Sequence, residues 1–522
     1  RRGHDRWRAS RRTGAGGRVA GGGGGGGAGG GAFGGLAAIG VCEGDLRLMQ
    51  ERHARWTLPR ARVLWSYFRY APAVSWWREA ARGLGADSGA RWASERGGPG
   101  ALGLAQERGL PPRLRAGGAG GGLRPATGAR PRDVVIENDI AWRVQAMVDF
   151  LFNRPIRIVS RVGGAGRAGL IERVLEAVWE ASGGAQLLQD AALIGHVHGS
   201  VDLIVRWVGE DAEAEESGEG DAALVRRAAR CVRIEIIEPS RGMALLDAGD
   251  YRKLRAFAVR LADGTMEVIG RTHRGRVVPG RDGERARVEG VGEHGVGAGR
   301  VPVVHVQNLS QPFSHEGLSE VEPLIPLQDE LNTRLSDRAN RVALQSFKMY
   351  LVKCVDGFEQ SAVGPGTVWA TDNPEASITA FGGDEQTPGE ESHIAEIRDA
   401  MDKQSGVPPL AAGLVRAKIG NLTSENALRI VLQGLLTRTA RKRLTYGRGI
   451  MEVNELVLAA LDAHGVIATM PSERATGVDW PDPLPTEERV AAEAARIRAD
   501  LGEDPGRALE RLNPDGREQG VE

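Results

Sequence analysis

The chain has 522 residues, and its 68 basic and 68 acidic side chains give a formal net charge of zero. This balance argues against a simple nucleic-acid coat protein, which would carry a basic excess. The length predicts two to four folding units. The sequence contains no apolar run of 18 residues, so it predicts no transmembrane helix. The widely spaced cysteines Cys42, Cys231 and Cys354 argue against a zinc ribbon or a disulfide framework and favour a reducing compartment.

The first 130 residues differ in composition from the rest. Residues 1–44 are rich in Gly and Arg, with unbroken glycine from Gly21 to Gly27, and we expect them to be disordered. The first methionine is Met49, so this part is a candidate for an extension upstream of a later start. Residues 45–130 are basic and rich in Trp; 45–55 and 64–81 have helical spacing of apolar residues, whereas 95–130 has the composition of a linker.

An ordinary domain composition begins at Val134. Apolar residues at helical spacing predict a helix from Ile140 to Phe152, which Pro155 ends. Further helices are predicted at 168–182 and 185–194, and loops at 209–222 and 275–299. Residues that alternate with period two, separated by turn signals, predict strands at 156–160, 196–208, 232–237, 254–261, 266–269 and 301–306. Since no βαβ rhythm occurs, we expect an antiparallel α+β arrangement.

The periodicity changes to helical after Gly317. Ser319 and Glu322 form a capping-box pattern, and the apolar residues that follow predict a helix of about 25–30 residues. A second helix is predicted at 390–404, with short strands and turns at 352–389 between the two. A glycine-spaced loop at 407–422 precedes a helix to about Leu444, further helices to about Leu461 and a charged helix at 487–501.

One pattern suggests a metal site. His196, His198 and Asp202 share one face if 196–208 is a strand, so they could begin a metal site of a soluble hydrolase. A third ligand is not evident, and half-buried strand histidines are the commoner explanation. The chain also lacks HExxH, a Walker loop and GxSxG. The sequence therefore predicts neither an enzyme nor a cofactor.

The order of several short motifs resembles the portal proteins of tailed bacteriophages. The motifs cover roughly 134–465, and the first 130 residues have no counterpart among them. They are Asn138-Asp139-Ile140 with Val148-Asp149 and Arg154-Pro155-Ile156, the strand Val301 to Asn308, Gly317 to Glu322 with Leu327 to Asn332, and Lys403 to Pro408.

This resemblance implies the fold and its parts. The fold would be α+β, a portal-type ring subunit with a mixed α/β wing, a two-helix stem, a small α/β clip, a long spanning helix and a helical C-terminal crown. The implied segments are the wing at 45–316, the stem at 317–351 and 390–406, the clip at 352–389, the tunnel loop at 407–422, the long wing helix at 423–445 and the crown at 446–522.

The resemblance also implies a function. Such proteins form a homo-oligomeric ring, usually of twelve copies, at one capsid vertex, and double-stranded DNA is packaged and ejected through its channel. The implied partners are DNA bound without sequence preference, the terminase large subunit, the major capsid and scaffold proteins, and head-completion or adaptor proteins. The implied location is the virion, and the host cytoplasm during assembly, with no membrane. Another kind of virion structural protein is the remaining alternative.

Three groups of residues are candidates for the channel and the subunit contacts. An acidic stem wall would repel the DNA backbone, and a basic, hinged loop would meet it locally. A basic run after the loop would pair between subunits or face DNA. The candidates are Glu390, Glu391, Glu396, Asp399 and Asp402 for the acidic wall; Leu410, Leu414, Val415, Arg416, Lys418 and Asn421 for the tunnel loop; and Arg438, Arg441, Lys442 and Arg443 for the basic run.

Overall fold

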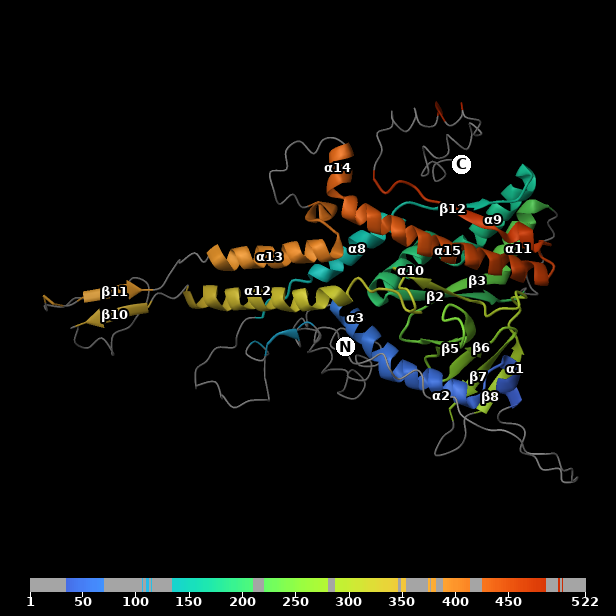
Figure 1. Ribbon diagram of the computed structural model, residues 1–522, viewed down its shortest axis with the longest axis horizontal. Coiled ribbons are helices and arrows are strands. Elements are labelled where there is room, and N and C mark those ends of the chain that lie inside the picture. Colours follow the sequence, from blue (N-terminus) through green and yellow to red (C-terminus); the bar gives the residue numbers. More distant parts are fainter. Residues whose placement is uncertain are drawn as a thin grey trace, which may run out of the picture.

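Two long helices project from a mixed helix-and-sheet body and end near a two-stranded hairpin (Figure 1). The helices are α12 (Ile325–Gln345) and α13 (Pro388–Ser405), and the hairpin pairs β10 (Met349–Lys353) with β11 (Ser377–Phe381). This computed structural model describes residues 34–69, 106, 109–111, 114, 134–209, 220–279, 287–345, 349–353, 374–375, 377–381, 388–413, 425–484, 496–497 and 500.

The two larger sheets of the body are antiparallel. One has the order β3–β2–β9, from Val232–Ile237, Ser200–Trp207 and Val303–Gln307. The other has the order β4–β5–β6–β7–β8, from Gly242–Leu246, Leu254–Arg260, Met266–Ile269, His273–Val278 and Arg287–Glu293. The antiparallel α+β prediction is therefore confirmed.

Part of the predicted loop at 275–299 is instead strand. The prediction was wrong there because β8 is an edge strand with mostly exposed side chains, so its sequence is rich in Gly and charge and lacks an apolar alternation. Other elements were also missed, including strand β4 and the helix α11 (Asp221–Cys231).

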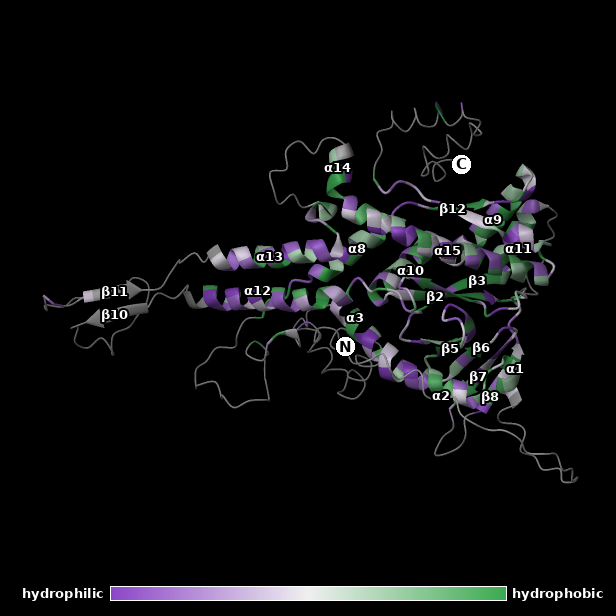
Figure 2. Cartoon of the chain, viewed as in Figure 1, coloured by the Kyte–Doolittle hydropathy of each residue, from purple (hydrophilic) through white to green (hydrophobic). Residues whose placement is uncertain are grey.

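Helices cover the three-stranded sheet and form the largest core with it. They include α8 (Asp139–Phe152), α9 (Ala165–Ala181), α10 (Gly184–His198) and α15 (Gln433–Ala463). Asn138 caps α8, since its side-chain oxygen accepts from the backbone N–H of Ala141 at 3.3 Å. Figure 2 shows green, apolar residues gathered in this body and a more hydrophilic projecting helix pair.

The predicted strand at 196–208 begins four residues late, at Ser200. Gly199 ends α10 in the left-handed conformation, with φ of 96°. A Cβ atom there would lie 2.4 Å from the carbonyl oxygen of Gly317, so the close approach also requires glycine. His196 and His198 consequently belong to the last turn of a helix.

The N-terminal helices α1 (Gly34–Ile39) and α2 (Glu43–Arg52) lie along the five-stranded sheet (Figure 1). The π-helical turn η1 (His53–Thr57) and α3 (Leu58–Phe68) follow, and α3 packs on α8 and α10. The expectation of disorder was wrong for 34–44, because Leu36, Ile39 and Val41 are buried against this sheet. Residues 1–33 lie outside the described part of the chain.

The long helix α15 crosses the predicted boundary between the wing helix and the crown at 445–446 without a break. The short helix α14 (Glu425–Val431) precedes it. The chain then returns to the body through η5 (Pro471–Arg474) and β12 (Thr476–Asp479), which pairs with β1 (Arg157–Ser160). The described residues after α15 therefore pack on the body, and the helix predicted at 487–501 lies mostly outside the described residues. No helix in the described ranges is long and apolar enough to span a bilayer.

Candidate functional site: the helix pair and its base

An apolar seam joins the two projecting helices. Ile394, Ile397 and Met401 of α13 recur at helical spacing and are buried in one cluster with Leu331 of α12 and Ile140 of α8. The opposite face of α13 is therefore left to solvent or to another molecule.

A polar ladder on α12 holds the segment that leads into α8. Gln328, Asn332 and Ser336 recur every four residues and are all fully buried. The Gln328 side-chain oxygen accepts from the backbone N–H groups of Asp139 at 3.0 Å and Ile140 at 3.2 Å. These N–H groups belong to the first turn of α8, which has no intrahelical acceptors for them, so α12 caps α8.

The other two rungs continue this contact. The Asn332 side-chain oxygen accepts from the backbone N–H of Glu137 at 3.1 Å, and the Ser336 hydroxyl accepts from that of Val135 at 3.0 Å. The side chains of α12 thus accept the hydrogen bonds that a neighbouring strand would accept from the extended residues before α8.

Ion pairs fasten α13 to the same region. Arg143 of α8 is fully buried and pairs with Asp139 at 3.1 Å and with Asp402 of α13. Arg398 of α13 pairs with Glu137 at 2.5 Å. A buried cation between two carboxylates is strongly favoured over one left alone, so α8 and the base of α13 are held together.

A second buried charge cluster ties α15 to the start of α12. Glu320 is 3% exposed and lies 2.8 Å from the Lys442 ammonium and 2.5 Å from the Arg438 guanidinium. Arg438 also donates to the backbone oxygen of Gln404 at 2.9 Å, next to the end of α13. Burial lowers the pKa of Lys442, and the Glu320 carboxylate opposes this effect.

The acidic wall of the sequence prediction is divided by the structure. Two of its members, Glu390 and Asp402, form ion pairs within the chain, with Arg341 and Arg143. The remaining three, Glu391, Glu396 and Asp399, have exposed side chains. Glu396 and Asp399 follow Ile394 and Ile397 by two residues, so they lie about 200° round the helix from the apolar seam.

The basic run is mostly used inside the subunit, which corrects the prediction of subunit pairing or DNA contact. Lys442 is 1% exposed and, like Arg438, pairs with Glu320. Arg443 donates to the backbone oxygen of Pro481 at 2.7 Å. Of the four predicted residues only Arg441 is exposed. The partners were missed because Glu320 lies more than a hundred residues earlier in the sequence.

The predicted tunnel loop is described only at its beginning. Leu410 lies half-buried in η4 (Pro409–Ala412), and Gly413 follows in the left-handed conformation with φ of 74°. The other five predicted residues lie outside the described residues: Leu414, Val415, Arg416, Lys418 and Asn421.

The suggested histidine metal site is not assembled as predicted. His196 and His198 end α10, whereas Asp202 lies in β2 and pairs with His305 of β9. Burial lowers the pKa of both α10 histidines, that of His198 to about 3. In the described ranges no three His, Cys, Asp or Glu side chains are grouped to hold a metal ion. His305 was not predicted as a site residue, although its alternation with Val304 and Val306 places it on the opposite face of the strand from those two side chains.

Comparison with known proteins assigns the family. The sequence-family model of SPP1 Gp6-like phage portal proteins matches residues 142–496, which is more than half of the chain. The chain therefore belongs to this portal protein family, a structural family, and has a portal or connector role.

Similar solved structures come from gene transfer agent (GTA) particles. The virion of a native particle matches at 15% identity and a TM-score of 0.36, over 70% of this chain and 85% of that chain. The neck of an empty particle, computed with C6 symmetry, matches at 15% identity and a TM-score of 0.39, over 70% and 87% of the two chains. The neck of a native particle, computed with C12 symmetry, matches at 15% identity and 0.37, over 70% and 86%. No curated protein sequence matches the chain.

Proposed function

We propose that the chain assembles into a closed homo-oligomeric ring, of twelve copies, at one vertex of a capsid. In this proposal α12 and α13 form the stem, the β10–β11 hairpin belongs to the clip, and the sheets with their covering helices form the wing. Family membership supports the assignment, as does the projection of an antiparallel helix pair, tipped by a hairpin, from a larger body. The segment after Gly413 would be the tunnel loop, and residues beyond α15 would contribute to the crown.

The ring would be a channel for double-stranded DNA during packaging and ejection. The observation that carries this proposal is the outer face of α13, where Glu396 and Asp399 are exposed opposite the seam and Lys403 is exposed one turn further on. Each cation that contacts a phosphate strengthens DNA binding, so a wall that must let DNA slide benefits from carboxylates. Repeated by the ring symmetry, the two carboxylates would form stacked negative rings that keep the duplex centred.

The proposed partners follow from this placement. The terminase large subunit, which supplies the ATPase, and later the head-completion or adaptor proteins would dock at the clip. The major capsid and scaffold proteins would contact the body. The chain would act without a cofactor and without catalysis of its own, in the virion after assembly in the host cytoplasm.

A packaging assay with charge-reversed rings tests the proposal. Glu396→Lys with Asp399→Lys places cations on the proposed wall, where they would attract phosphates and slow sliding. We expect less DNA packaged per particle, with ring mass unchanged. The matched control is Glu289→Lys with Glu293→Lys on β8, exposed acids of the other end of the body, which should package like the wild type. Equal packaging by the α13 variant and the wild type would overturn the acidic-wall proposal.

A further inference from the structure

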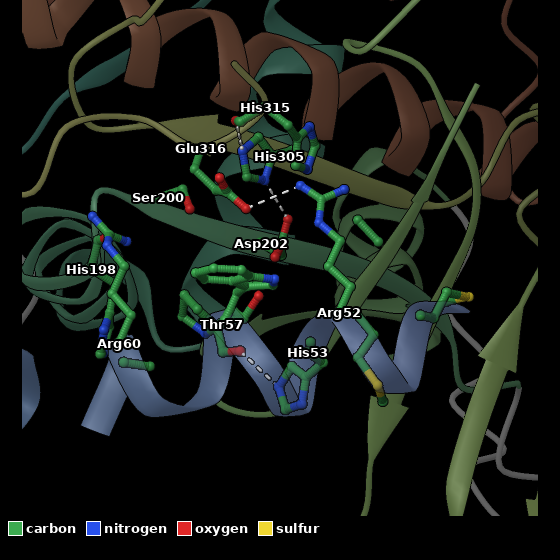
Figure 3. A pocket seen from close by; sticks show the side chains of 17 residues that line it. Arg52, His53, Thr57, Arg60, His198, Ser200, Asp202, His305, His315 and Glu316 are labelled. Atoms are coloured by element: carbon green, nitrogen blue, oxygen red, sulfur yellow. Dashed lines mark hydrogen bonds and ion pairs between the residues drawn. The ribbon is translucent and has the colours of Figure 1, made fainter. Parts of the chain in front are cut away.

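His305 lies in a buried polar cluster at a cavity of 390 Å³ between the N-terminal helices and the three-stranded sheet (Figure 3). It stands opposite Asp202 in the register of β9 and β2. Its Nδ1 is 2.7 Å from the Asp202 carboxylate, and its Nε2 is 2.7 Å from the backbone oxygen of His315. The rings of His305 and His315 are stacked with their centroids 3.7 Å apart.

Both ring nitrogens of His305 therefore face oxygen atoms. A neutral imidazole has one N–H donor and one lone pair, so it can serve only one of these two oxygens. The two short contacts require two protons, one in each bridge. Because a carboxyl is a far stronger acid than an imidazolium, both protons belong to His305 and the Asp202 carboxylate is ionised.

The bridge joins the sheet to the connection between β9 and the projecting helices. Residues 308–318 leave β9 and lead into η2 (Glu322–Leu324) and α12. His315 in this connection is held through its backbone oxygen by His305 and also by the Gln307 side chain, at 2.9 Å. Glu316 pairs with Arg52 of α2 at 3.3 Å.

We propose that His305 is an imidazolium in the folded protein at neutral pH and serves as a proton-dependent latch that holds residues 308–318 on the sheet. Loss of the proton leaves a lone pair against one of the two oxygens, so one bridge opens. The latch concerns the folded subunit and does not depend on ring formation.

The surrounding charges support this protonation state. Burial alone would lower the pKa of His305, but Asp202, the His315 carbonyl and Glu316 outweigh it and raise the pKa above its ordinary value. The cations Arg52 and Arg60 also line the cavity, and each pairs with a carboxylate, Glu316 or Glu322.

The other histidines at the cavity are neutral. Burial lowers the pKa of His198 to about 3, with Arg60 contributing, and that of His315 to about 2, with the charge of His305 contributing. Burial also lowers the pKa of His53. The cluster thus holds a single charged imidazole among neutral ones, and titration above neutral pH isolates His305.

Hydrogen exchange of the full chain tests the latch. The amide of Leu318, which donates to Leu309 at 3.0 Å, reports whether the connection is closed. Exchange of peptides covering 308–318 is measured by mass spectrometry from pH 6 to pH 9 and corrected for the intrinsic rate. We expect the protection factor to be constant at the acid end and to fall about ten- to a hundredfold as the pH rises through the raised pKa. Wild-type protection that is the same at pH 6 and pH 9 would overturn the proposal.

Variants check that His305 is the titrating group. Asp202→Asn removes the stabilising anion, so the loss of protection should begin at a lower pH. His305→Gln should have reduced protection with no pH dependence. His273→Gln on β7, which changes a histidine outside the cluster, should retain the wild-type profile. A His305→Gln variant that kept the wild-type profile would also overturn the proposal.

Discussion

Replacement of Glu320 by glutamine should remove the anion that holds α15 to the start of α12. Lys442 is 1% exposed, and besides Glu320 its ammonium lies near the Met147 sulfur at 3.3 Å. Removal of one partner of such a buried pair costs about 3–5 kcal/mol. The loss of folding free energy has an upper limit, because the unpaired Lys442 can give up its proton and become neutral. Neutralising a lysine of ordinary pKa 10.5 at pH 7 costs about 5 kcal/mol.

The free energy of unfolding, from urea denaturation at pH 7 and fixed protein concentration, measures this loss. The matched control is Glu452→Gln on α15, which breaks a pair with Arg448, whose side chain is 75% exposed. That control should cost less than about 0.5 kcal/mol. Glu320→Gln combined with Lys442→Met should be less destabilised than the sum of the two single variants, since neither buried charge remains. A loss below about 1 kcal/mol for Glu320→Gln would refute the reasoning.

Two further predictions concern pH and the polar ladder. His198 and His315, with pKa values of about 3 and about 2, are neutral in the folded chain. Because both pKa values are lowered in the folded chain, the unfolded chain takes up protons at a higher pH than the folded chain does. The free energy of unfolding is therefore highest above about pH 6.5 and falls by about 3 kcal/mol for the pair at pH 5.5. The loss is measured as the difference in pH dependence between the wild type and a variant with His198→Gln and His315→Gln, from urea denaturation at pH 7.5 and pH 5.5, and the same pH dependence in both would contradict it. Gln328→Leu leaves the N–H group of Ile140 without its acceptor and that of Asp139 with the Glu137 carbonyl alone, so unfolding should become easier by about 1–3 kcal/mol. The exposed Gln433→Leu is its control in the same denaturation experiment, and a similarly small effect of both variants would count against the capping role.

The helix pair was predictable because its signals are local. Leu327, Leu331 and Leu335 recur at helical spacing in α12, and the capping pattern marks the start of that region. The order of motifs gave the family, which the match over 142–496 confirms. The acidic face of α13 was partly predictable, since the composition is local but the partners of Glu390 and Asp402 are not.

Other features depend on contacts that no local pattern contains. Glu320 and Lys442 meet only after the sheets and α15 are in place, so the basic run resembled a surface. The helix-to-strand change at Gly199 was hidden, because the apolar residues on both sides of it also fit a strand. The strands β7 and β8 were missed because glycine and charge replace the apolar alternation that usually marks strands.

Electron microscopy of the purified full chain tests the central proposal most directly. The proposal predicts closed rings with a central hole of about 20–40 Å, wide enough for a duplex whose major groove alone is about 12 Å wide. It also predicts that α13 lines the hole, with Glu396 and Asp399 facing inward. A monomer or dimer at every protein concentration, or a ring whose α13 acidic face points outward, would contradict it.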